Sequence, residues 1–296
     1  MTISFEGKVA IVTGAGGGLG KAHALELARR GAKVVVNDLG GSVDGSGGSS
    51  AAAEAVVEEI RAMGGEAIAN GGSVSDKAGA KSMVDDAVKH FGTVHILINN
   101  AGILRDKSFS KMSLEDFEAV VNVHLMGSVY VTKFCWEIMK EQQYGRILMT
   151  TSGSGLFGNF GQTNYSAAKL GMVGFMNTLK LEGAKYNVYT NALAPAALTR
   201  MTENLLPGEV AESLPPELVT PGALYMVCDD APNGVIIQAQ GGSFGVAAIL
   251  QNEKVDLGKN PTVEDVAANW DRISDLSEVG TRTAEQKLVT QPPKKG

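Results

Sequence analysis

The first thirty residues combine an apolar run, a glycine-rich turn and a helical pattern. Residues 8–13, KVAIVT, are almost wholly apolar, as expected for a strand buried on both faces of a sheet. TGAGGGLG follows at 13–20, and residues 18–30 carry apolar side chains at helical spacing. A strand with two buried faces needs helices on both sides of its sheet. This opening therefore predicts an α/β fold.

The same alternation continues along the chain. Further strands are expected at 33–38, 67–70, 94–100, 146–152, 188–195 and 234–242. Further helices are expected at about 50–63, 76–90, 114–140, 163–184 and 217–229. Strands that alternate with helices indicate right-handed crossovers. We therefore predict a Rossmann-type, doubly wound parallel sheet of about seven strands with helices on both faces.

Composition bounds the domain organisation. The chain has 296 residues, and hydrophobic residues make up 44% of them, which suits one large domain with a sizeable core. We expect that domain to cover residues 1–250. The remainder, 251–296, is polar, with a short helical pattern at 262–275 around Trp270. We therefore expect a partly helical C-terminal extension.

Charge and cysteine content exclude several classes of protein. The net charge of -6 argues against nucleic-acid binding. No apolar stretch is long enough to span a membrane, and the N-terminus lacks a secretory pattern. Cys135 and Cys228 have no metal-ligand spacing, which indicates free thiols in a reducing compartment. We expect a soluble, cytoplasmic protein without a bound metal.

The turn at 13–20 carries the first candidate binding residues. Gly14, Gly18 and Gly20 have no Cβ, so the backbone can turn tightly and approach a pyrophosphate. Leu19 lies in the same turn, and the helix that starts there offers amide donors and a favourable dipole. A glycine cluster can also be an ordinary loop. Its position between a strand and a helix favours a dinucleotide site.

The second predicted strand ends in an acidic residue, Asp38, eighteen residues after Gly20. A carboxylate there can accept hydrogen bonds from both hydroxyls of an adenosine ribose, and it repels a 2′-phosphate. Leu39, Gly40 and Gly41 follow it, with no arginine to hold a phosphate. This pattern predicts NAD rather than NADP. The structural alternative is that Asp38 is a turn residue before Gly40.

The fourth predicted strand ends in NNAG, residues 99–102. Small residues at this point would let the strand end pass close to an adenine ring and its ribose. Asn99, Ala101 and Gly102 are therefore candidate cofactor contacts. In open α/β sheets, ligands bind at this carboxyl edge of the strands.

Ser152 and the segment YSAAK, residues 165–169, suggest catalysis at the same edge. Tyr165 and Lys169 lie one helical turn apart on one face. A tyrosine with a pKa of about 10 is a weak base at neutral pH, and a nearby ammonium lowers that pKa. A second positive charge, such as an oxidised nicotinamide, would lower it further, and Ser152 could hold the reacting oxygen. The alternative is a packed tyrosine beside a solvated lysine.

These motifs together resemble the short-chain dehydrogenase/reductase family, over about residues 5–245. Longer segments, such as YGRILMTTSGSGLFGNFGQTNYSAAKLG (144–171) and PTVEDVAANW (261–270), resemble one subgroup of it. That subgroup comprises the (3R)-hydroxyacyl-CoA dehydrogenase domains of multifunctional enzymes. The resemblance implies that Tyr165 transfers the proton, Lys169 lowers its pKa and binds the nicotinamide ribose, and Ser152 orients the substrate oxygen. It also implies that Pro195 and Leu198 contact the cofactor.

Some positions depart from the family pattern. His124 stands near the place of the family's fourth catalytic residue, where many members have Asn. That residue acts largely through its main-chain carbonyl in the family, so His124 is a candidate catalytic residue. Otherwise it is a satisfied helix histidine. Ser73 replaces an Asp that often contacts adenine, and Ala196 replaces the usual Gly after Pro195.

The resemblance leaves the substrate open. The first hypothesis is an NAD-dependent (3R)-3-hydroxyacyl-CoA dehydrogenase of fatty acid β-oxidation. The second is a dehydrogenase of a steroid or other secondary alcohol, and the third is an inactive nucleotide-binding regulatory protein. The variable substrate loop of the family falls here at about 196–216. Apolar residues of this loop could line an acyl path or be lid packing: Leu198, Met201, Leu205 and Leu206.

An acyl-CoA substrate carries phosphates, so cations are expected at the rim of the cleft. The candidates are Arg105, Lys107, Lys111 and Arg200, any of which could instead belong to a solvated charged face. The family also suggests a homodimer or homotetramer. Its contacts are expected along the helices predicted at 114–140 and 163–184.

Overall fold

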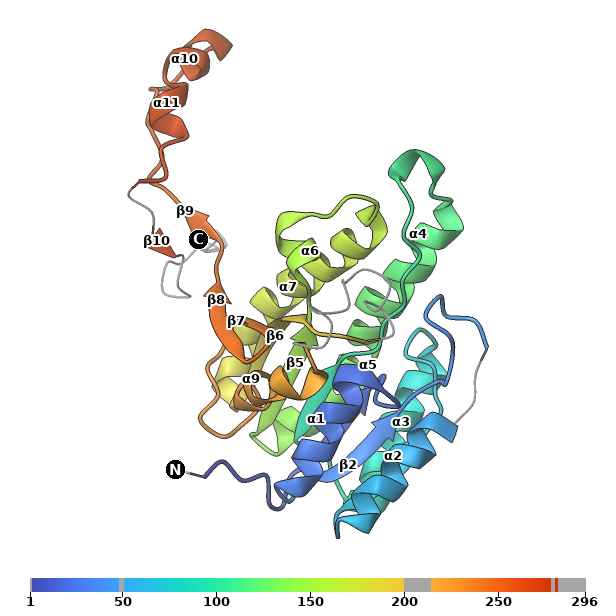
Figure 1. The fold of residues 1–296 in the computed structure, drawn as a ribbon. Helices are drawn as coiled ribbons and strands as arrows, with labels where there is room; N and C mark the ends of the chain where they lie inside the picture. Colours follow the sequence, from blue (N-terminus) through green and yellow to red (C-terminus); the bar gives the residue numbers. More distant parts are fainter. Residues whose placement is uncertain (1, 48–50, 200–213, 278–279, 282–296) are drawn as a thin grey trace, which may run out of the picture. The chain divides into compact units, whose positions relative to one another are not determined.

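The computed structural model describes residues 2–47, 51–199, 214–277 and 280–281. The chain divides into two compact units, Met1–Val246 and Ala247–Gly296. The first unit contains the sheet and all the site residues discussed below (Figure 1). Each unit is described by itself.

Within the described residues, one eight-stranded sheet organises the first unit, in the order β3-β2-β1-β4-β5-β6-β7-β8. The seven strands expected from the sequence are β1 (Val9–Thr13), β2 (Lys33–Asn37), β3 (Glu66–Asn70), β4 (Ile96–Asn99), β5 (Gly145–Thr150), β6 (Val188–Ala196) and β7 (Ile236–Gln240). All of them pair in parallel. The predicted Rossmann-type, doubly wound sheet is confirmed.

An eighth strand, β8 (Ser243–Ala247), was not predicted. Gly241 and Gly242 join it to β7, and both have positive φ, +50° and +79°. Two such residues form the tight turn that connects antiparallel neighbours, whereas parallel strands need a long crossover. The sheet is therefore mixed at this edge.

Strand β1 lies at the point where the direction of winding reverses. It pairs with β2 on one side and with β4 on the other. The chain thus winds outward in both directions from β1, which leaves a crevice above its carboxyl end. This reversal places the turn after β1 beside the ends of β2 and β4.

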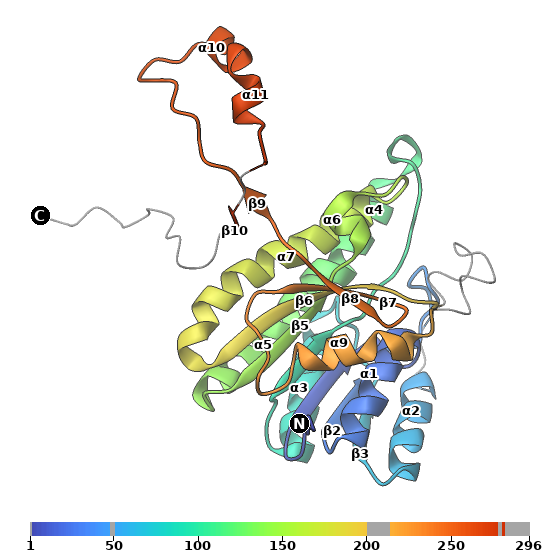
Figure 2. The ribbon, with the colours of Figure 1, turned by 60° about the vertical axis from the view of Figure 1, so that its left-hand side comes forward.

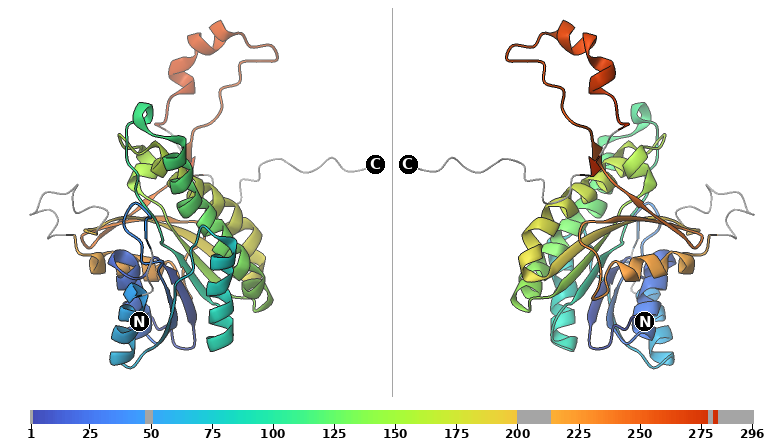
Figure 3. Two further views of the ribbon diagram at one scale, coloured as in Figure 1. Left: turned by 90° about the vertical axis from the view of Figure 1, so that its right-hand side faces the viewer. Right: turned by 90° about the vertical axis from the view of Figure 1, so that its left-hand side faces the viewer.

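Helices cover both faces of the sheet (Figures 2 and 3). On one face, α1 (Gly18–Arg29) packs against α2 (Ala51–Ala62) and α9 (Thr220–Tyr225). The other face carries α3 (Lys77–Phe91), α5 (Gly127–Glu141) and α7 (Thr163–Gly183). Strands β1, β4 and β5 are buried along their whole length because both of their faces are covered.

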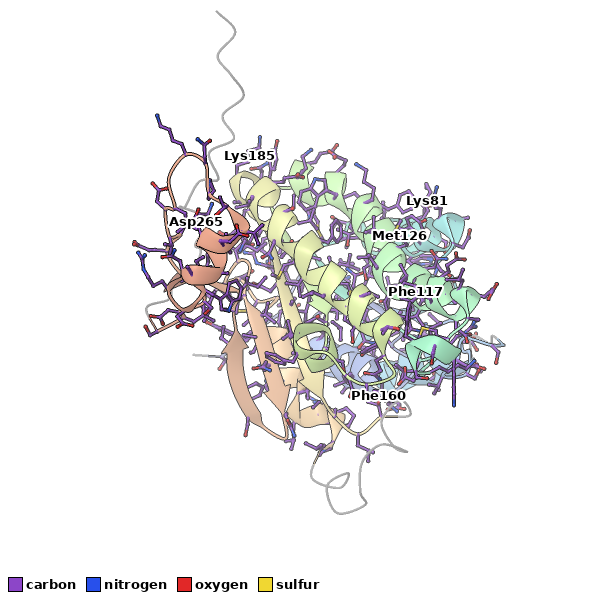
Figure 4. The ribbon with its side chains drawn as sticks, turned by 90° about the horizontal axis from the view of Figure 1, so that it is seen from above. Lys81, Phe117, Met126, Phe160, Lys185 and Asp265 are labelled. Atoms are coloured by element: carbon purple, nitrogen blue, oxygen red, sulfur yellow. The ribbon has the colours of Figure 1, made fainter. Side chains whose placement is uncertain are left out.

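The single helix predicted at 114–140 is interrupted. It consists of α4 (Leu114–Val121), a π-helical turn η2 (Asn122–Met126) and α5. Both α4 and η2 contact α7, and Figure 4 shows Phe117 and Met126 along their course. π-turns inside helices often occur at functional sites, and this one carries His124.

The second unit contains a small antiparallel pair, β9 (Leu250–Gln251) with β10 (Gly280–Thr281). Between them lie α10 (Val263–Ala268) and α11 (Trp270–Ile273). Thr262 and Asp265 form a capping box that starts α10. The helical pattern expected at 262–275 is therefore two short helices. Across the described part of the chain, no helix has the length and apolar character needed to cross a membrane.

Candidate active site

A cavity of about 780 Å³ opens along the carboxyl ends of the parallel strands. The glycine turn after β1 and Asp38 after β2 line one part of it. Tyr165 and Lys169 of α7 line another part. Residues more than 150 positions apart in the sequence thus face one space, as the predicted topology requires.

The turn after β1 is closely packed around its glycines. Gly14 has a φ of +64°, and a Cβ there would lie 2.8 Å from the Cα of Ala101. A Cβ on Gly20 would lie 2.3 Å from the carbonyl oxygen of Gly14. Gly18 and Leu19 line the cavity at the first turn of α1. Any side chain at Gly14 or Gly20 would displace the backbone, so the turn fits the close approach of a phosphate.

Asn100 holds this turn in place, and the sequence reading missed it. Its side-chain nitrogen donates to the carbonyl oxygens of Thr13 at 2.9 Å and Gly14 at 3.1 Å. Asn99 points elsewhere, because its buried side chain donates to the hydroxyl of Thr132 at 3.1 Å. Asn99 therefore does not line the cavity, whereas Asn100, Ala101 and Gly102 do. Alternation of side chains along β4 could have indicated which asparagine faces the edge.

Asp38 is 8% exposed and lies at the end of β2. Its Oδ2 accepts from the amide of Gly16 at 2.8 Å, and its Oδ1 accepts from the amide of Gly40 at 2.6 Å. The carboxylate is thus fixed between the glycine turn and the residues that follow β2. It lines the cavity with a defined orientation.

Ser152 follows β5 rather than ending it. The strand stops at Thr150, and Ser152 is the N-cap of the short helix α6 (Gly153–Phe157), where its Oγ accepts from the amide of Ser154 at 3.1 Å. A serine at an N-cap satisfies an otherwise unpaired helix amide. The same side chain is hydrogen-bonded to the phenol of Tyr165.

Lys169 is 2% exposed, and its Nζ donates to the carbonyl oxygen of Thr150 at 2.5 Å. Its Nζ lies 5.3 Å from the centroid of the Tyr165 ring, one turn away on α7. Gly155 of α6 packs directly above, since a Cβ there would lie 2.7 Å from the Cβ of Lys169. The end of β5 and α6 therefore hold the lysine head group beside the tyrosine.

Burial dominates the acid–base properties of this pair. It raises the pKa of Tyr165 to about 12, with the hydrogen bond from Ser152 opposing the rise and the charge of Asp106 adding to it. Burial also lowers the pKa of Lys169 to about 7. The protein by itself therefore favours a protonated phenol at neutral pH. A further positive charge in the cavity would be needed to make Tyr165 a base.

His124 is buried with its ring edge-on to Tyr165, the centroids 5.1 Å apart and the planes at 88°. Its Nε2 lies 2.8 Å from the carbonyl oxygen of Ile103. Its Nδ1 has no hydrogen-bond partner within the described residues. Burial, and secondly the charge of Lys169, hold the pKa of His124 well below its usual range, so the imidazole is neutral. A Cβ on Gly102 would lie 2.1 Å from the His124 Cε1, so any side chain at this position would force the imidazole to shift.

The end of β6 contributes Pro195 to the cavity, and the segment after it contributes Ala197 and Thr199. Leu198 does not line it; its amide donates to the carbonyl oxygen of Leu214 at 2.6 Å. Four loop residues singled out from the sequence lie outside the described residues: Arg200, Met201, Leu205 and Leu206. Ser73 lines the cavity near the end of β3.

Two of the candidate rim cations share one carboxylate. Arg105 Nη1 lies 3.3 Å from Asp116 Oδ1, and Lys107 Nζ lies 2.8 Å from Asp116 Oδ2. These ion pairs hold the pKa of Asp116 below its usual value. Lys111 is exposed in the short helix Phe109–Lys111. Arg105 lines the cavity, whereas Lys107 and Lys111 do not.

Together these residues fit a nicotinamide dinucleotide. A Cβ at Gly14 or Gly20 would meet neighbouring backbone, so these glycines permit the tight turn that a pyrophosphate site needs. Asp38 presents a fixed carboxylate one strand away, and a polar pair suited to proton transfer lies across the cavity. Among the described residues, no group of three or more His, Cys, Asp or Glu side chains is placed to hold a metal ion. Cys135 and Cys228 are free and buried.

Comparison with known proteins supports this interpretation. Residues 8–209 match the sequence profile of the short chain dehydrogenase family. A short-chain type dehydrogenase/reductase of Mycobacterium tuberculosis is 52% identical over 282 residues, covering 95% of this chain and 98% of that protein. The mouse peroxisomal multifunctional enzyme type 2 is 48% identical over 285 residues. That match covers 93% of this chain but 38% of the mouse enzyme, and it confirms the resemblance to the multifunctional subgroup.

A solved structure shares the fold as well. 7α-Hydroxysteroid dehydrogenase, complexed with NADH and 7-oxo glycochenodeoxycholic acid, has a TM-score of 0.73 and 28% identity. The match covers 81% of this chain and 95% of that one. The similarity therefore extends over most of the sheet and the helices around it.

Proposed function

This chain belongs to the short-chain dehydrogenase family, and from that membership we propose that it is an NAD-dependent enzyme that interconverts (3R)-3-hydroxyacyl-CoA and 3-ketoacyl-CoA. One observation carries the proposal. Ser152, Tyr165 and Lys169 face the same cavity as the glycine turn and Asp38. A hydride acceptor seated on the turn would reach the substrate carbon beside the tyrosine.

Tyr165 acts as the general base in oxidation and as the general acid in reduction. Bound NAD supplies the hydride acceptor, and its nicotinamide adds positive charge near the phenol. Ser152, already hydrogen-bonded to Tyr165, is placed to hold the substrate oxygen while Tyr165 Oη takes its proton. The short helix α6 keeps the serine in that orientation.

Lys169 stabilises the phenolate form of Tyr165. Its Nζ is fixed by the Thr150 carbonyl, so the charge cannot swing into solvent. His124 also lines the cavity, with its ring edge-on to the Tyr165 ring. Its unpaired Nδ1 is suited to hold a water between the buried pair and the outside, which makes His124 the fourth candidate catalytic residue.

Asp38 selects NAD over NADP in this proposal. Its fixed carboxylate would accept hydrogen bonds from the adenosine ribose and repel a 2′-phosphate. The remaining cofactor contacts are assigned to the glycine turn (Gly14, Gly18, Leu19 and Gly20), to Ala101 and Gly102, and to Pro195. Asn100 supports the turn, in place of the expected role of Asn99.

The relatives support two candidate substrate classes. The mouse multifunctional enzyme supports an acyl-CoA of fatty acid β-oxidation, although this chain spans only 38% of its length. The second candidate is a steroid or other secondary alcohol. It is favoured by the similarity to a dehydrogenase bound to a 7-oxo bile acid. Either substrate would use the same four residues, Ser152, Tyr165, Lys169 and His124.

Assembly, location and domain limits are further parts of the proposal. We expect a homodimer or homotetramer packed through α4, α5 and α7, located in the cytoplasm. The catalytic domain is assigned to residues 1–250 and the C-terminal extension to 251–296.

Purified protein with NAD and a panel of alcohols tests the proposal. We expect NADH absorbance at 340 nm with (3R)-3-hydroxyacyl-CoA, and none with the (3S) isomer. Turnover of a steroid alcohol without any turnover of the (3R) thioesters would replace the first candidate with the second. Failure to bind NADH at all would refute both.

A further inference from the structure

A glycine-rich insert, residues 39–47, follows Asp38 and forms a wall of the cavity. Five of its residues lie on the cavity surface: Leu39, Gly41, Ser42, Val43 and Gly45. In a doubly wound sheet the adenosine half of a dinucleotide lies on the β2 side of the reversal point. The insert therefore stands beside the space that the adenosine ribose would occupy.

The insert is a turn organised around its own carboxylate. Asp44 Oδ1 accepts from the Ser42 hydroxyl at 2.5 Å and from the amide and hydroxyl of Ser46 at 3.0 and 2.8 Å. These bonds lower the pKa of Asp44 to about 2. The amide of Ser42 also donates to the carbonyl oxygen of Ser46 at 2.8 Å. The Asp44 carboxylate is thus occupied within the turn, which leaves the Asp44 main-chain carbonyl for contacts outside it.

The insert meets the body of the protein along the residues that follow β4. The amide of Leu104 donates to the carbonyl oxygen of Val43 at 3.0 Å. Gly45, with a φ of +89°, packs on Ile103, whose Cγ2 would lie 3.2 Å from a Cβ at that position. A backbone hydrogen bond and a packing contact thus place the insert against the loop that runs from β4 to α4.

Arg105 adds the side-chain connection. Its Nε donates to the main-chain carbonyl of Asp44 at 2.9 Å, and its Nη1 donates to Asp116 Oδ1 of α4 at 3.3 Å. The planar fork of a guanidinium can make both bonds at once, which a lysine ammonium does poorly. Lys107 binds the same Asp116 carboxylate at 2.8 Å, and among the described residues no hydrogen bond joins its side chain to the insert. The side-chain bond to Asp44 therefore distinguishes Arg105 from Lys107.

We propose that Arg105 is a positioning residue for the adenosine half of the cofactor, holding the glycine-rich insert as a fixed wall beside Asp38. This inference rests on the proposed function, since it requires a nicotinamide dinucleotide in the cavity. Glycine-rich segments lose much conformational entropy when they are ordered. If the insert is already ordered before the cofactor binds, this entropy loss does not reduce the binding free energy.

Arg105 lines the cavity, so it could in principle meet a substrate phosphate directly. The geometry points away from that role, because two of its three guanidinium nitrogens, Nε and Nη1, already donate to Asp44 and Asp116. The two roles predict that substitution of Arg105 weakens the binding of different ligands. A wall residue affects adenosine-containing fragments of the cofactor, whereas a phosphate contact affects the acyl-CoA.

The test compares R105M with the matched control K107M, using calorimetric Kd values for three probes. We expect R105M to bind NADH and ADP-ribose about tenfold more weakly, the size of effect that loss of one charged hydrogen bond produces. Nicotinamide mononucleotide, which lacks the adenosine, should bind within about twofold of the wild type. K107M should stay within about twofold for all three.

A second readout follows the insert itself. Hydrogen exchange of the Ser42 and Ser46 amides should become faster in R105M and stay unchanged in K107M. R105K retains the charge without the fork and should also bind ADP-ribose more weakly than the wild type. This variant serves as the test if R105M fails to fold.

The possible outcomes distinguish failure of the Arg105 inference from failure of the proposed dehydrogenase function. Wild-type affinity for ADP-ribose in R105M or R105K overturns the inference, as does an equal loss for nicotinamide mononucleotide. A rise in KM for the acyl-CoA alone would assign Arg105 to substrate phosphate binding instead. If the wild type itself fails to bind NADH, the proposed function is what has failed.

Discussion

The Nζ of Lys169 lies 5.3 Å from the centroid of the Tyr165 ring. The two residues are one turn apart on α7, Lys169 buried and Tyr165 half-buried. Their burial sets the two pKa values in opposite directions, tyrosine to about 12 and lysine to about 7. Both shifts disfavour the charged forms. The pair is therefore close to electrically neutral until a positively charged ligand favours the phenolate.

Tyr165→Phe tests the proton-transfer role directly. We expect kcat to fall by roughly 10²–10⁴-fold, the usual contribution of a general acid or base, because phenylalanine has no hydroxyl to take or give the proton. NADH affinity should change little, since the ring and its packing against His124 remain. Stopped-flow turnover and fluorescence titration of NADH give both values. Loss of NADH binding would instead make Tyr165 a structural residue.

Asp38→Ala tests cofactor selection. Removing the carboxylate removes its repulsion of a 2′-phosphate, so the ratio of kcat/KM for NADP to that for NAD should rise by roughly tenfold or more. Part of the effect will be lower stability, because the amides of Gly16 and Gly40 lose their acceptor. Thermal melts with and without NADH measure that part. An unchanged ratio of the two cofactors would contradict the ribose assignment.

Gly102→Ala tests the contact between the NNAG segment and the histidine. A methyl group there would overlap His124 Cε1, so we expect a loss of about 1–3 kcal/mol in the free energy of unfolding. His124→Ala removes the obstacle. In the double variant the Gly102→Ala change should therefore cost much less than in the wild type. Urea unfolding of all four proteins completes the cycle, and additive losses would show that the two residues do not interact.

Lys169→Met tests the depressed pKa of the lysine through stability. The folded pKa of about 7 lies below the unfolded value of about 10.4, so between these values the unfolded state binds more protons. Stability therefore rises with pH in this window, by up to roughly 1.4 kcal/mol per unit, as the cost of the buried charge is relieved. We expect the unfolding free energy of the wild type, measured relative to that of Lys169→Met, to increase from pH 7 to 10. Parallel curves would place the lysine pKa near its ordinary value.

Periodicity along the chain was enough to predict most of the scaffold. The runs 8–13 and 33–38 became β1 and β2 because consecutive apolar residues indicate strands covered on both faces. β8 was missed because its exposed residues lack that signature, and the glycine pair before it resembles a loop. The interruption of the helix at His124 was also missed, since a π-turn keeps a helical apolar pattern.

Motif spacing identified the segments of the site but not every side chain in them. NNAG was correctly placed at the sheet edge, yet Asn100 rather than Asn99 supports the turn, because β4 directs alternate side chains to opposite faces. Leu198 was expected in the cavity, but its amide bonds Leu214 and its side chain lies off the cavity surface. The orientation of Leu198 depends on a bond to a residue further along the chain, so the local sequence does not encode it.

Family membership, the doubly wound sheet and the spacing of Tyr165 and Lys169 can be read from the sequence, because each depends on local periods and short motifs. The tertiary structure alone decided the pKa directions of that pair, the edge-on approach of His124 and the anchoring of the insert by Arg105. Each of these depends on burial and on contacts between residues distant in the chain. Such contacts are set by how the elements pack, which no single segment specifies.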